Sequence, residues 1–354
     1  MSVDQLPFSR IRPAPAGRSR SRRLLDRALA RPSLGALVGL VAVVLFFGAR
    51  APGLLTAGGL ASVLDVAAVL GIGGVAVAVL LIAGQFDLSV GVVAVASSLV
   101  AALLVSQAGW GIWPSLAVSL AAALLVGLVN GLLVVSTGLP SFLVTLATFL
   151  VLQGATQAVA EAVVGTSRIG ALDASEGWGS AVAVFGSAFQ LGDGRYRVSL
   201  VWWLVVTLLA SWLLWRTRFG NAVLATGGAR RPASELGVPV GWTTVVLYLG
   251  TAGAGWLLGT LGLARIGAVQ VDPGLGAEIQ FVVVAVIGGC LLNGGYGSAV
   301  GAAYGALLYA VAREGIALAG WDPRWFQTLL GVLLLVALLA NGVVQRRLLA
   351  VPRS

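Results

Sequence analysis

Few side chains of this chain can do acid–base, nucleophilic or metal chemistry. The sequence contains no His, one Cys and 22 basic residues, all of them Arg. Without Lys the chain cannot form the Gly-x-x-x-x-Gly-Lys loop that holds ATP phosphates. Without His it cannot form a Ser-His-Asp triad or a His zinc site. The sequence therefore predicts a protein that is not an enzyme and binds no cofactor or metal itself, and it favours a carrier or channel.

The remaining candidates for chemistry stand in or beside long apolar stretches. Asp87 precedes one, Glu278 stands at the start of another, and Asn130 lies inside a third. A carboxylate inside a membrane is costly, which favours a role in a solute path or gate. The alternatives are that Asp87 caps a helix, that Glu278 stabilises a helix N-terminus, and that Asn130 only bonds a neighbouring helix. Phe142 and Thr145 either line the same path or pack in the core.

These residues require elements that place them inside a membrane. Hydrophobic residues make up 58% of the 354 and charged residues only 10%, and the mean hydropathy is +0.99. A soluble domain carries roughly 25% charged residues. At about 20 apolar residues per crossing, we expect an all-α integral membrane protein of about eight to ten transmembrane helices, with short ones broken or re-entrant. The predicted spans are 33–49, 61–84, 88–107, 114–136, 140–164, 198–217, 240–262, 277–292, 298–315 and 326–343.

The distribution of Arg predicts the topology. Residues 1–32 are rich in Arg, Pro and Ser, which is typical of a disordered tail; we expect membrane lipid, and not nucleic acid, beside it. Arg also concentrates in 217–239 and near the C-terminus, and cytoplasmic segments carry the excess of Arg. We therefore expect a transmembrane domain over 33–345 with an external segment at 165–197. The loop at 217–239, the tail at 346–354 and both termini are then cytoplasmic.

Two interruptions of the apolar pattern resemble each other. Residues 82–87 and 287–295 both end an apolar span with glycines and a polar residue, and a helix of small residues follows each. Paired interruptions are typical of two related halves around a transport path. Glycines four residues apart, which allow two helix backbones to approach closely, occur at Gly127 and Gly131, at Gly255 and Gly259, and at Gly297, Gly301 and Gly305.

Four sequence blocks carry a resemblance to a known family. The blocks are Gly84–Gly91, then Gly127–Gly131 with Leu139–Leu146, then Thr217–Gly220 with Ala225–Gly228 and Ala233–Val238, and finally the glycines at 288, 289, 294, 295 and 297. In sequence and in order they resemble the sugar permeases of bacterial ATP-binding cassette importers, the ribose/xylose type within the branched-chain amino acid/ribose permease superfamily. The departures are Gln85, where the family often has Gly, the long Arg-rich tail, and the lack of Lys in the cytoplasmic loop.

The resemblance implies a type II importer architecture and a set of partners. Such a permease lies in the bacterial plasma (inner) membrane and pairs with a second permease copy, a cytoplasmic ATPase that uses ATP and Mg, and an external solute-binding protein. The solute is a monosaccharide or a similar small polar molecule. The cytoplasmic loop is then the ATPase coupling segment, with a short helix at Pro232–Leu236 and Ala233 facing the ATPase. Its candidate residues are Phe219, Gly220, Gly227, Gly228, Arg230, Arg231 and Ala233.

Two other classes of membrane protein compete with this interpretation. An ion-coupled secondary carrier of a small polar solute is one, but such carriers usually contain buried ionisable relays, and the few carboxylates here lie near span ends. A membrane transferase is the other, and it would need clustered catalytic acids or His on a loop. Both are less consistent with the residues than the importer permease.

Overall fold

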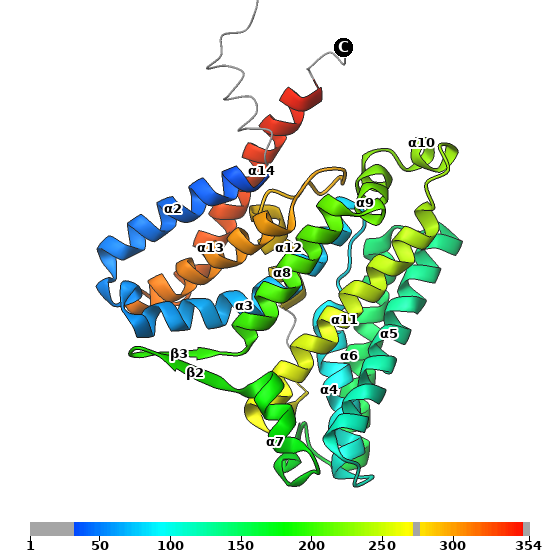
Figure 1. The fold of residues 1–354 in the computed structure, drawn as a ribbon, viewed down its shortest axis with the longest axis vertical. Helices are drawn as coiled ribbons and strands as arrows, with labels where there is room; N and C mark the ends of the chain where they lie inside the picture. The colour runs from blue at the N-terminus through cyan, green and yellow to red at the C-terminus, as the bar shows by residue number, and fades with distance from the viewer. Residues whose placement is uncertain (1–31, 272–276, 350–354) are drawn as a thin grey trace, which may run out of the picture.

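The computed structural model describes residues 32–271 and 277–349, and its regular structure is almost entirely helical (Figure 1). The predicted tail at 1–32 lies outside the described residues apart from its last position. Each predicted span overlaps one helix. These helices are α2 (Pro32–Arg50), α3 (Ala57–Ile82), α4 (Val90–Ser106), α5 (Ile112–Thr137), α6 (Ser141–Val164), α8 (Ser199–Arg216), α11 (Val240–Ile266), α12 (Ala277–Ile287), α13 (Ala299–Leu318) and α14 (Trp325–Leu349).

Among the described residues, seven helices are long and apolar enough to cross a membrane, and α4 and α12 are apolar but shorter. The largest differences from the predicted boundaries are at the ends of α12 and α14. α12 ends at Ile287 and not near residue 292, because Gly289 adopts a φ of 93°, a left-handed conformation that ends helices. α14 continues to Leu349, past the predicted end of the membrane domain at residue 345.

Glycines allow the closest helix contacts. A Cβ atom at Gly127 of α5 would lie 2.6 Å from the carbonyl oxygen of Tyr248 in α11. A Cβ atom at Gly255 of α11 would lie 2.8 Å from the carbonyl oxygen of Val90 in α4. Glycine therefore lets these helices touch backbone to backbone, as the spacing predicts. α4, α5, α6 and α11 lie together in one group (Figure 1).

The second group forms around α3, which contacts α8, α12 and α13 and also reaches α11. α2 covers α13, and α14 packs on α12 and α13 (Figure 1). Gly301 and Gly305 of α13 face backbone atoms of α12. Gly297, predicted to share their helix face, precedes α13, because Ser298 caps that helix by accepting a hydrogen bond from Gly301 N at 2.9 Å.

The predicted external segment at 165–197 contains short regular elements. Its β1 (Arg168–Ile169) pairs antiparallel with β4 (Val269–Gln270). Asp65 of α3 anchors the segment, because its carboxylate lies 3.4 Å from Arg197 Nε and 2.9 Å from Arg265 Nη1. The other short elements of this segment are η2 (Leu172–Ala174), α7 (Trp178–Ala181), the π-helical turn η3 (Val182–Gly186), and the hairpin of β2 (Ala188–Leu191) and β3 (Gly194–Arg197). A further short helix, η1 (Pro52–Leu55), joins α2 to α3.

The predicted cytoplasmic loop forms two short helices, α9 (Arg218–Gly228) and α10 (Arg230–Glu235). Thr217 caps α9 by accepting a hydrogen bond from Gly220 N at 3.0 Å. The predicted helix at Pro232–Leu236 is therefore present, but it begins earlier, at Arg230. α9 and α10 lie at the end of the molecule opposite α7 and the β2–β3 hairpin (Figure 1).

Candidate functional site

A non-helical connection at residues 83–89, between α3 and α4, is the centre of the candidate site. Its backbone bonds to side chains of other helices, because no water is available to it inside a membrane. Phe86 N donates to Ser141 Oγ of α6 at 3.0 Å, and Leu88 N donates to Thr145 Oγ1 at 3.2 Å. The Phe86 carbonyl accepts from the Tyr248 hydroxyl of α11 at 2.8 Å. The connection is thus held by α6 and α11 through groups far apart in the sequence.

Asp87 is 2% exposed at the middle of this connection. One carboxylate oxygen accepts from Ser89 N at 2.8 Å and Ser89 Oγ at 2.6 Å, and the other accepts from Thr251 Oγ1 of α11 at 2.5 Å. The N-cap of α4 is Ser89, whose own side chain makes no capping hydrogen bond. The alternative that Asp87 is the N-cap of α4 is therefore wrong: the N-cap is Ser89, and the Asp87 carboxylate accepts from Thr251 of α11.

Asn130 extends the network to two more helices. Its side chain is fully buried in α5 and donates to Ser89 Oγ at 3.0 Å. Its carbonyl oxygen accepts from Thr148 Oγ1 of α6 at 2.6 Å. The predicted interhelical hydrogen bond of Asn130 is confirmed. A buried polar network that is hydrogen-bonded in this way fixes one arrangement of the four helices.

The structure brings most of the predicted path residues together. Thr145 belongs to the network through Leu88. Glu278 is 6% exposed in the first turn of α12, beside the first turn of α4, since a Cβ atom at Gly91 would lie 2.9 Å from its Cδ. Phe142 is separate, because its side chain is 46% exposed on α6.

Sequence reasoning missed five members of the network, one of which is Thr148, the donor to Asn130. Ser89 has a local signal, because it follows Asp87 by two residues, a spacing at which an Asp side chain accepts from the backbone. Ser141, Tyr248 and Thr251 have none, since each is an ordinary polar residue within an apolar helix. Only the packing of α6 and α11 against the connection identifies them.

The predicted coupling segment reaches this site through glycines. A Cβ atom at Gly227 of α9 would lie 2.6 Å from Gly295 N and would also overlap the carbonyl oxygen of Ile82. Gly295 N donates to the same Ile82 oxygen at 2.8 Å. A Cβ atom at Gly294 would lie 2.8 Å from Gly84 Cα. We call the meeting point of Gly84, Gly227, Gly294 and Gly295 the glycine junction; it joins α9 to both interruptions of the apolar pattern.

Of the other candidate coupling residues, two pack inside the molecule and three are exposed on its surface. Phe219 is half-buried and packs on the core. Gly220 allows the sharp corner between α8 and α9, where a Cβ atom would lie 2.6 Å from Leu214 Cα. Gly228, Arg230 and Arg231 are exposed.

The prediction that Ala233 faces a partner is wrong, because it is 6% exposed on the inner side of α10. The small apolar side chain turns toward α9 and α11, and α10 contacts both helices. Leu236, directly after α10, is 86% exposed. Leu236 is therefore more exposed than Leu224, the other exposed leucine of this segment.

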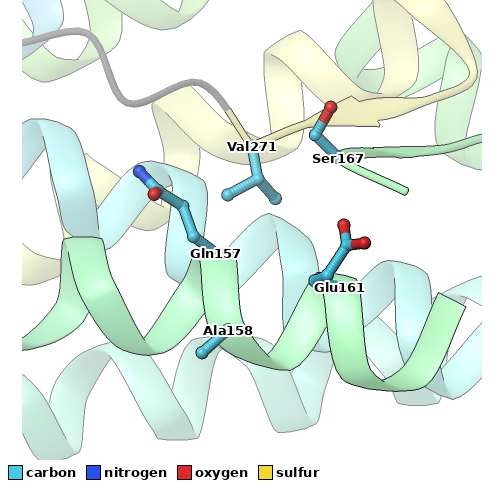
Figure 2. Close-up of a pocket in the computed structure, with 5 residues that line it drawn as sticks. All are labelled: Gln157, Ala158, Glu161, Ser167 and Val271. Atoms are coloured by element: carbon cyan, nitrogen blue, oxygen red, sulfur yellow. The ribbon is translucent and has the colours of Figure 1, made fainter. Parts of the chain in front are cut away.

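An open pocket of about 400 Å³, lined by polar and apolar side chains, lies toward the other end of α6. Figure 2 shows its lining residues between α6 and the chain around β1 and β4. Gln157 and Glu161 of α6 point toward Ser167 and Val271 on the opposite wall (Figure 2). The fifth lining residue is Ala158.

Comparison with known proteins identifies the family. Residues 59–338 match the model of the permease component of the branched-chain amino acid transport system. The chain belongs to this family. No solved structure matches it.

Three curated relatives show how far the similarity extends. The fructose import permease protein FrcC of Rhizobium meliloti is 31% identical over 80% of this chain and 78% of its own length. The ribose import permease protein RbsC of Escherichia coli K12 is 29% identical over 92% of this chain and 98% of its own. The galactose/methyl galactoside import permease protein MglC of Escherichia coli K12 is 27% identical over 63% and 64%. This chain is therefore a multi-pass membrane permease subunit.

Proposed function

We propose that this permease forms the membrane pathway of an ATP-driven importer for a monosaccharide. FrcC, RbsC and MglC are import permeases named for fructose, ribose and galactose. The observation that carries the proposal is the glycine junction, because it connects the Arg-rich α9–α10 segment directly to the buried Asp87 connection. Family membership favours this over the ion-coupled carrier considered from the sequence.

The gate of the pathway is the network around Asp87. Its hydrogen bonds join the start of α4 to α5, α6 and α11. Separation of α11 from α4 breaks the bond between Thr251 and Asp87, which leaves a buried carboxylate with fewer donors. The closed arrangement is therefore favoured until a partner supplies free energy. Asn130 and Thr145 hold the same connection, and Glu278 of α12 lies beside Gly91 in the first turn of α4.

That free energy comes from a separate ATPase, since the chain has no Lys for a phosphate loop. The ATPase binds α10 and the exposed residues around it, namely Arg230, Arg231 and Leu236. Movement of α9 displaces Gly227, and Gly227 contacts both interruptions through backbone atoms. ATP and Mg bind to that partner and not to this chain.

The remaining partners follow from the topology. Arg concentrates around α9 and α10 and near the C-terminus, so these parts face the cytoplasm of a bacterial plasma membrane. The segment at 165–197 then lies outside, where a solute-binding protein docks. A second permease copy completes the pathway, and lipid covers the other apolar faces.

Reconstitution tests the proposal as a whole. Proteoliposomes that contain this permease, its partner permease, the ATPase and the binding protein should take up labelled D-ribose, D-fructose or D-galactose only when ATP is present. Uptake driven by a proton gradient in the absence of the ATPase would overturn the proposal and restore the carrier interpretation.

A separate experiment tests the proposed ATPase-binding surface on α10 and Leu236. Leu236→Glu should reduce co-purification of the ATPase and ATP-dependent uptake at least about tenfold, because a charge replaces an apolar contact worth about 1.5 kcal/mol or more. Its thermal stability should equal that of the wild type, since the position is exposed. Ala233→Glu is the matched control: it should lower the melting temperature, because the position is buried. Full association of the Leu236→Glu variant with the ATPase would show that the ATPase binds another surface.

A further inference from the structure

Phe185 of the external segment is enclosed by aromatic rings from three membrane helices. It lies in the π-helical turn η3 and is 7% exposed. Its ring stacks on Trp202 of α8 at a centroid distance of 5.4 Å and meets Trp256 of α11 edge to face at 6.1 Å. Trp113 of α5 is the third neighbour, at 6.2 Å. We call these four side chains the aromatic cluster; the turn that carries Phe185 is of a rare kind that often occurs at functional sites.

Two tryptophans of the aromatic cluster also bind the external segment through their indole N–H groups. Trp113 Nε1 donates to Ser180 Oγ of α7 at 2.8 Å, and Trp202 Nε1 donates to the Val184 carbonyl oxygen of η3 at 2.9 Å. Trp near the end of a membrane span usually anchors that span at the lipid–water interface. Here the two indoles instead hold α7 and η3 against α5 and α8.

The external segment also touches the backbone of α11. Gly186 follows Phe185, and a Cβ atom at Gly186 would overlap the Ala264 carbonyl oxygen and lie 2.8 Å from the carbonyl carbon. Trp256 is itself fixed, because its Nε1 donates to Ser119 Oγ of α5 at 3.0 Å. The C-terminal half of α11 therefore packs against η3 at two points that are about two helical turns apart.

The same helix carries two hydrogen bonds of the gate, those from Tyr248 to Phe86 and from Thr251 to Asp87. Thr251 precedes Trp256 by five residues, which is about 7.5 Å along the helix axis and about 140° around it. The two side chains therefore lie on different faces of α11, and a displacement of the helix as a body moves both. α11 extends from the end of the molecule that holds α9 to the end that holds α7 (Figure 1).

We propose that Phe185 is a positioning residue that transmits the docking of the solute-binding protein through α11 to the gate. The inference rests on the proposed function, in which that protein docks on residues 165–197. Before docking, the aromatic cluster fixes α11 in the position where Thr251 binds Asp87. Docking displaces η3, α11 follows because it packs against η3, and the bond between Thr251 and Asp87 breaks. The gate is therefore released only when the binding protein is seated outside.

ATP hydrolysis by the assembled importer tests this role. Phe185→Ala should bring hydrolysis in the presence of saturating binding protein down to nearly the basal rate, because η3 then loses its aromatic contacts with α11, α5 and α8. Saturation excludes weaker docking as the cause of the loss. Phe326→Ala is the matched control, since it removes an edge-to-face contact with Tyr309 between α14 and α13 and should keep the wild-type stimulation. Wild-type stimulation in Phe185→Ala would overturn the proposal.

Hydrogen exchange in the purified permease tests the link to the gate without any need for transport. Phe185→Ala should speed amide exchange in residues 83–89 on the order of tenfold, the equivalent of about 1.4 kcal/mol lost from the closed arrangement. α13 is the internal control and should exchange as in the wild type, because it packs in the other group of helices. Phe326→Ala should leave exchange in residues 83–89 unchanged. Equal exchange there in Phe185→Ala and the wild type would overturn the proposal.

A double substitution separates transmission from general loosening of the fold. Thr251→Val removes the hydroxyl that binds Asp87 and should itself speed exchange in residues 83–89. Addition of Phe185→Ala should then speed it by less than about twofold more, because the bond through which Phe185 acts is already absent. Additive effects are the rule for distant sites without shared partners. Additivity here would show that Phe185 only stabilises the fold, which would overturn the proposal.

The two proposals fail in different ways. Absence of ATP-driven uptake in the wild-type complex would overturn the proposed function, whereas exchange in residues 83–89 would still decide whether Phe185 acts on this connection. Normal wild-type uptake together with wild-type stimulation in Phe185→Ala would overturn the positioning role alone.

Discussion

The two interruptions of the apolar pattern begin alike and then differ. After α3, Gly84 takes a φ of 74° and Gln85 N donates to Leu80 O at 3.1 Å. After α12, Gly289 takes a φ of 93° and Cys290 N donates to Ala285 O at 3.1 Å. Both helices thus end in the same glycine-based arrangement, in which the third residue after the helix bonds back to its last turn.

Beyond these turns the two segments use their polar groups differently. The first connection, residues 83–89, bonds outward to α5, α6 and α11 through side chains. The second, residues 288–298, folds on itself, with Leu291 N donating to Tyr296 O at 3.1 Å and Gly294 N to Leu291 O at 3.1 Å. The first is therefore suited to switching between helix partners, whereas the second is a preformed turn against which the first rests.

The largest expected effect comes from breaking the contact of both segments with α9. Gly227→Leu should abolish uptake, because even its Cβ atom would overlap Ile82 O and lie 2.6 Å from Gly295 N. Overpacking of this kind costs about 1–3 kcal/mol or more. Gly228→Ala is the matched control, since nothing lies within 4 Å of its Cβ position. Uptake at equal membrane levels measures the difference, and normal transport by Gly227→Leu would remove the glycine junction from the coupling route.

A smaller loss of uptake is expected when the charge of Asp87 is removed from the first segment, and almost none when a neutral side chain of the second segment is shortened. Asp87→Asn keeps an acceptor for Ser89 but removes the carboxylate that accepts from Thr251. Hydrogen bonds to charged groups contribute about 1.5–3 kcal/mol, so uptake should fall at least about tenfold. Cys290→Ala in the second segment should transport almost normally, because that buried side chain has no role in the gate.

The result is measured as initial uptake rate at matched protein levels. Wild-type rates for Asp87→Asn would mean that the charge has no role in the gate and that only the turn at Ser89 matters.

The smallest expected effect is a difference in stability between alanine variants of two glycines at the glycine junction, because their Cβ positions have different free space. Gly84→Ala should cost about 1–2 kcal/mol of stability, because its φ is 74° but its nearest foreign atom is 3.6 Å from the Cβ position. Gly294→Ala should cost more, since φ is 81° and its Cβ atom would lie 2.8 Å from Gly84 Cα. Melting temperatures of the two purified variants give the comparison. The reverse order would show that the second segment can move away from the first.

The sequence alone determined which residues span the membrane and where the apolar pattern is interrupted. Hydropathy is a property of consecutive residues, so spans such as 114–136 and 140–164 coincide with α5 and α6 almost to the residue. The glycine pair of Gly127 and Gly131 likewise indicated a close helix contact before any partner was known. The loop at 217–239 was recognisable from its Arg content and its resemblance to a coupling segment.

Only the tertiary structure decided which side chains meet. Asp87 and Thr251 are 164 positions apart in the chain, and no local pattern links them. Ala233 lies in a polar, Arg-rich segment, yet the packing of α10 on α9 and α11 buries it. Gly227 gains its importance from the approach of Ile82 and Gly295. Local composition fixes each helix, whereas hydrogen-bond partners and burial depend on how distant helices pack, and that packing is set by the whole chain.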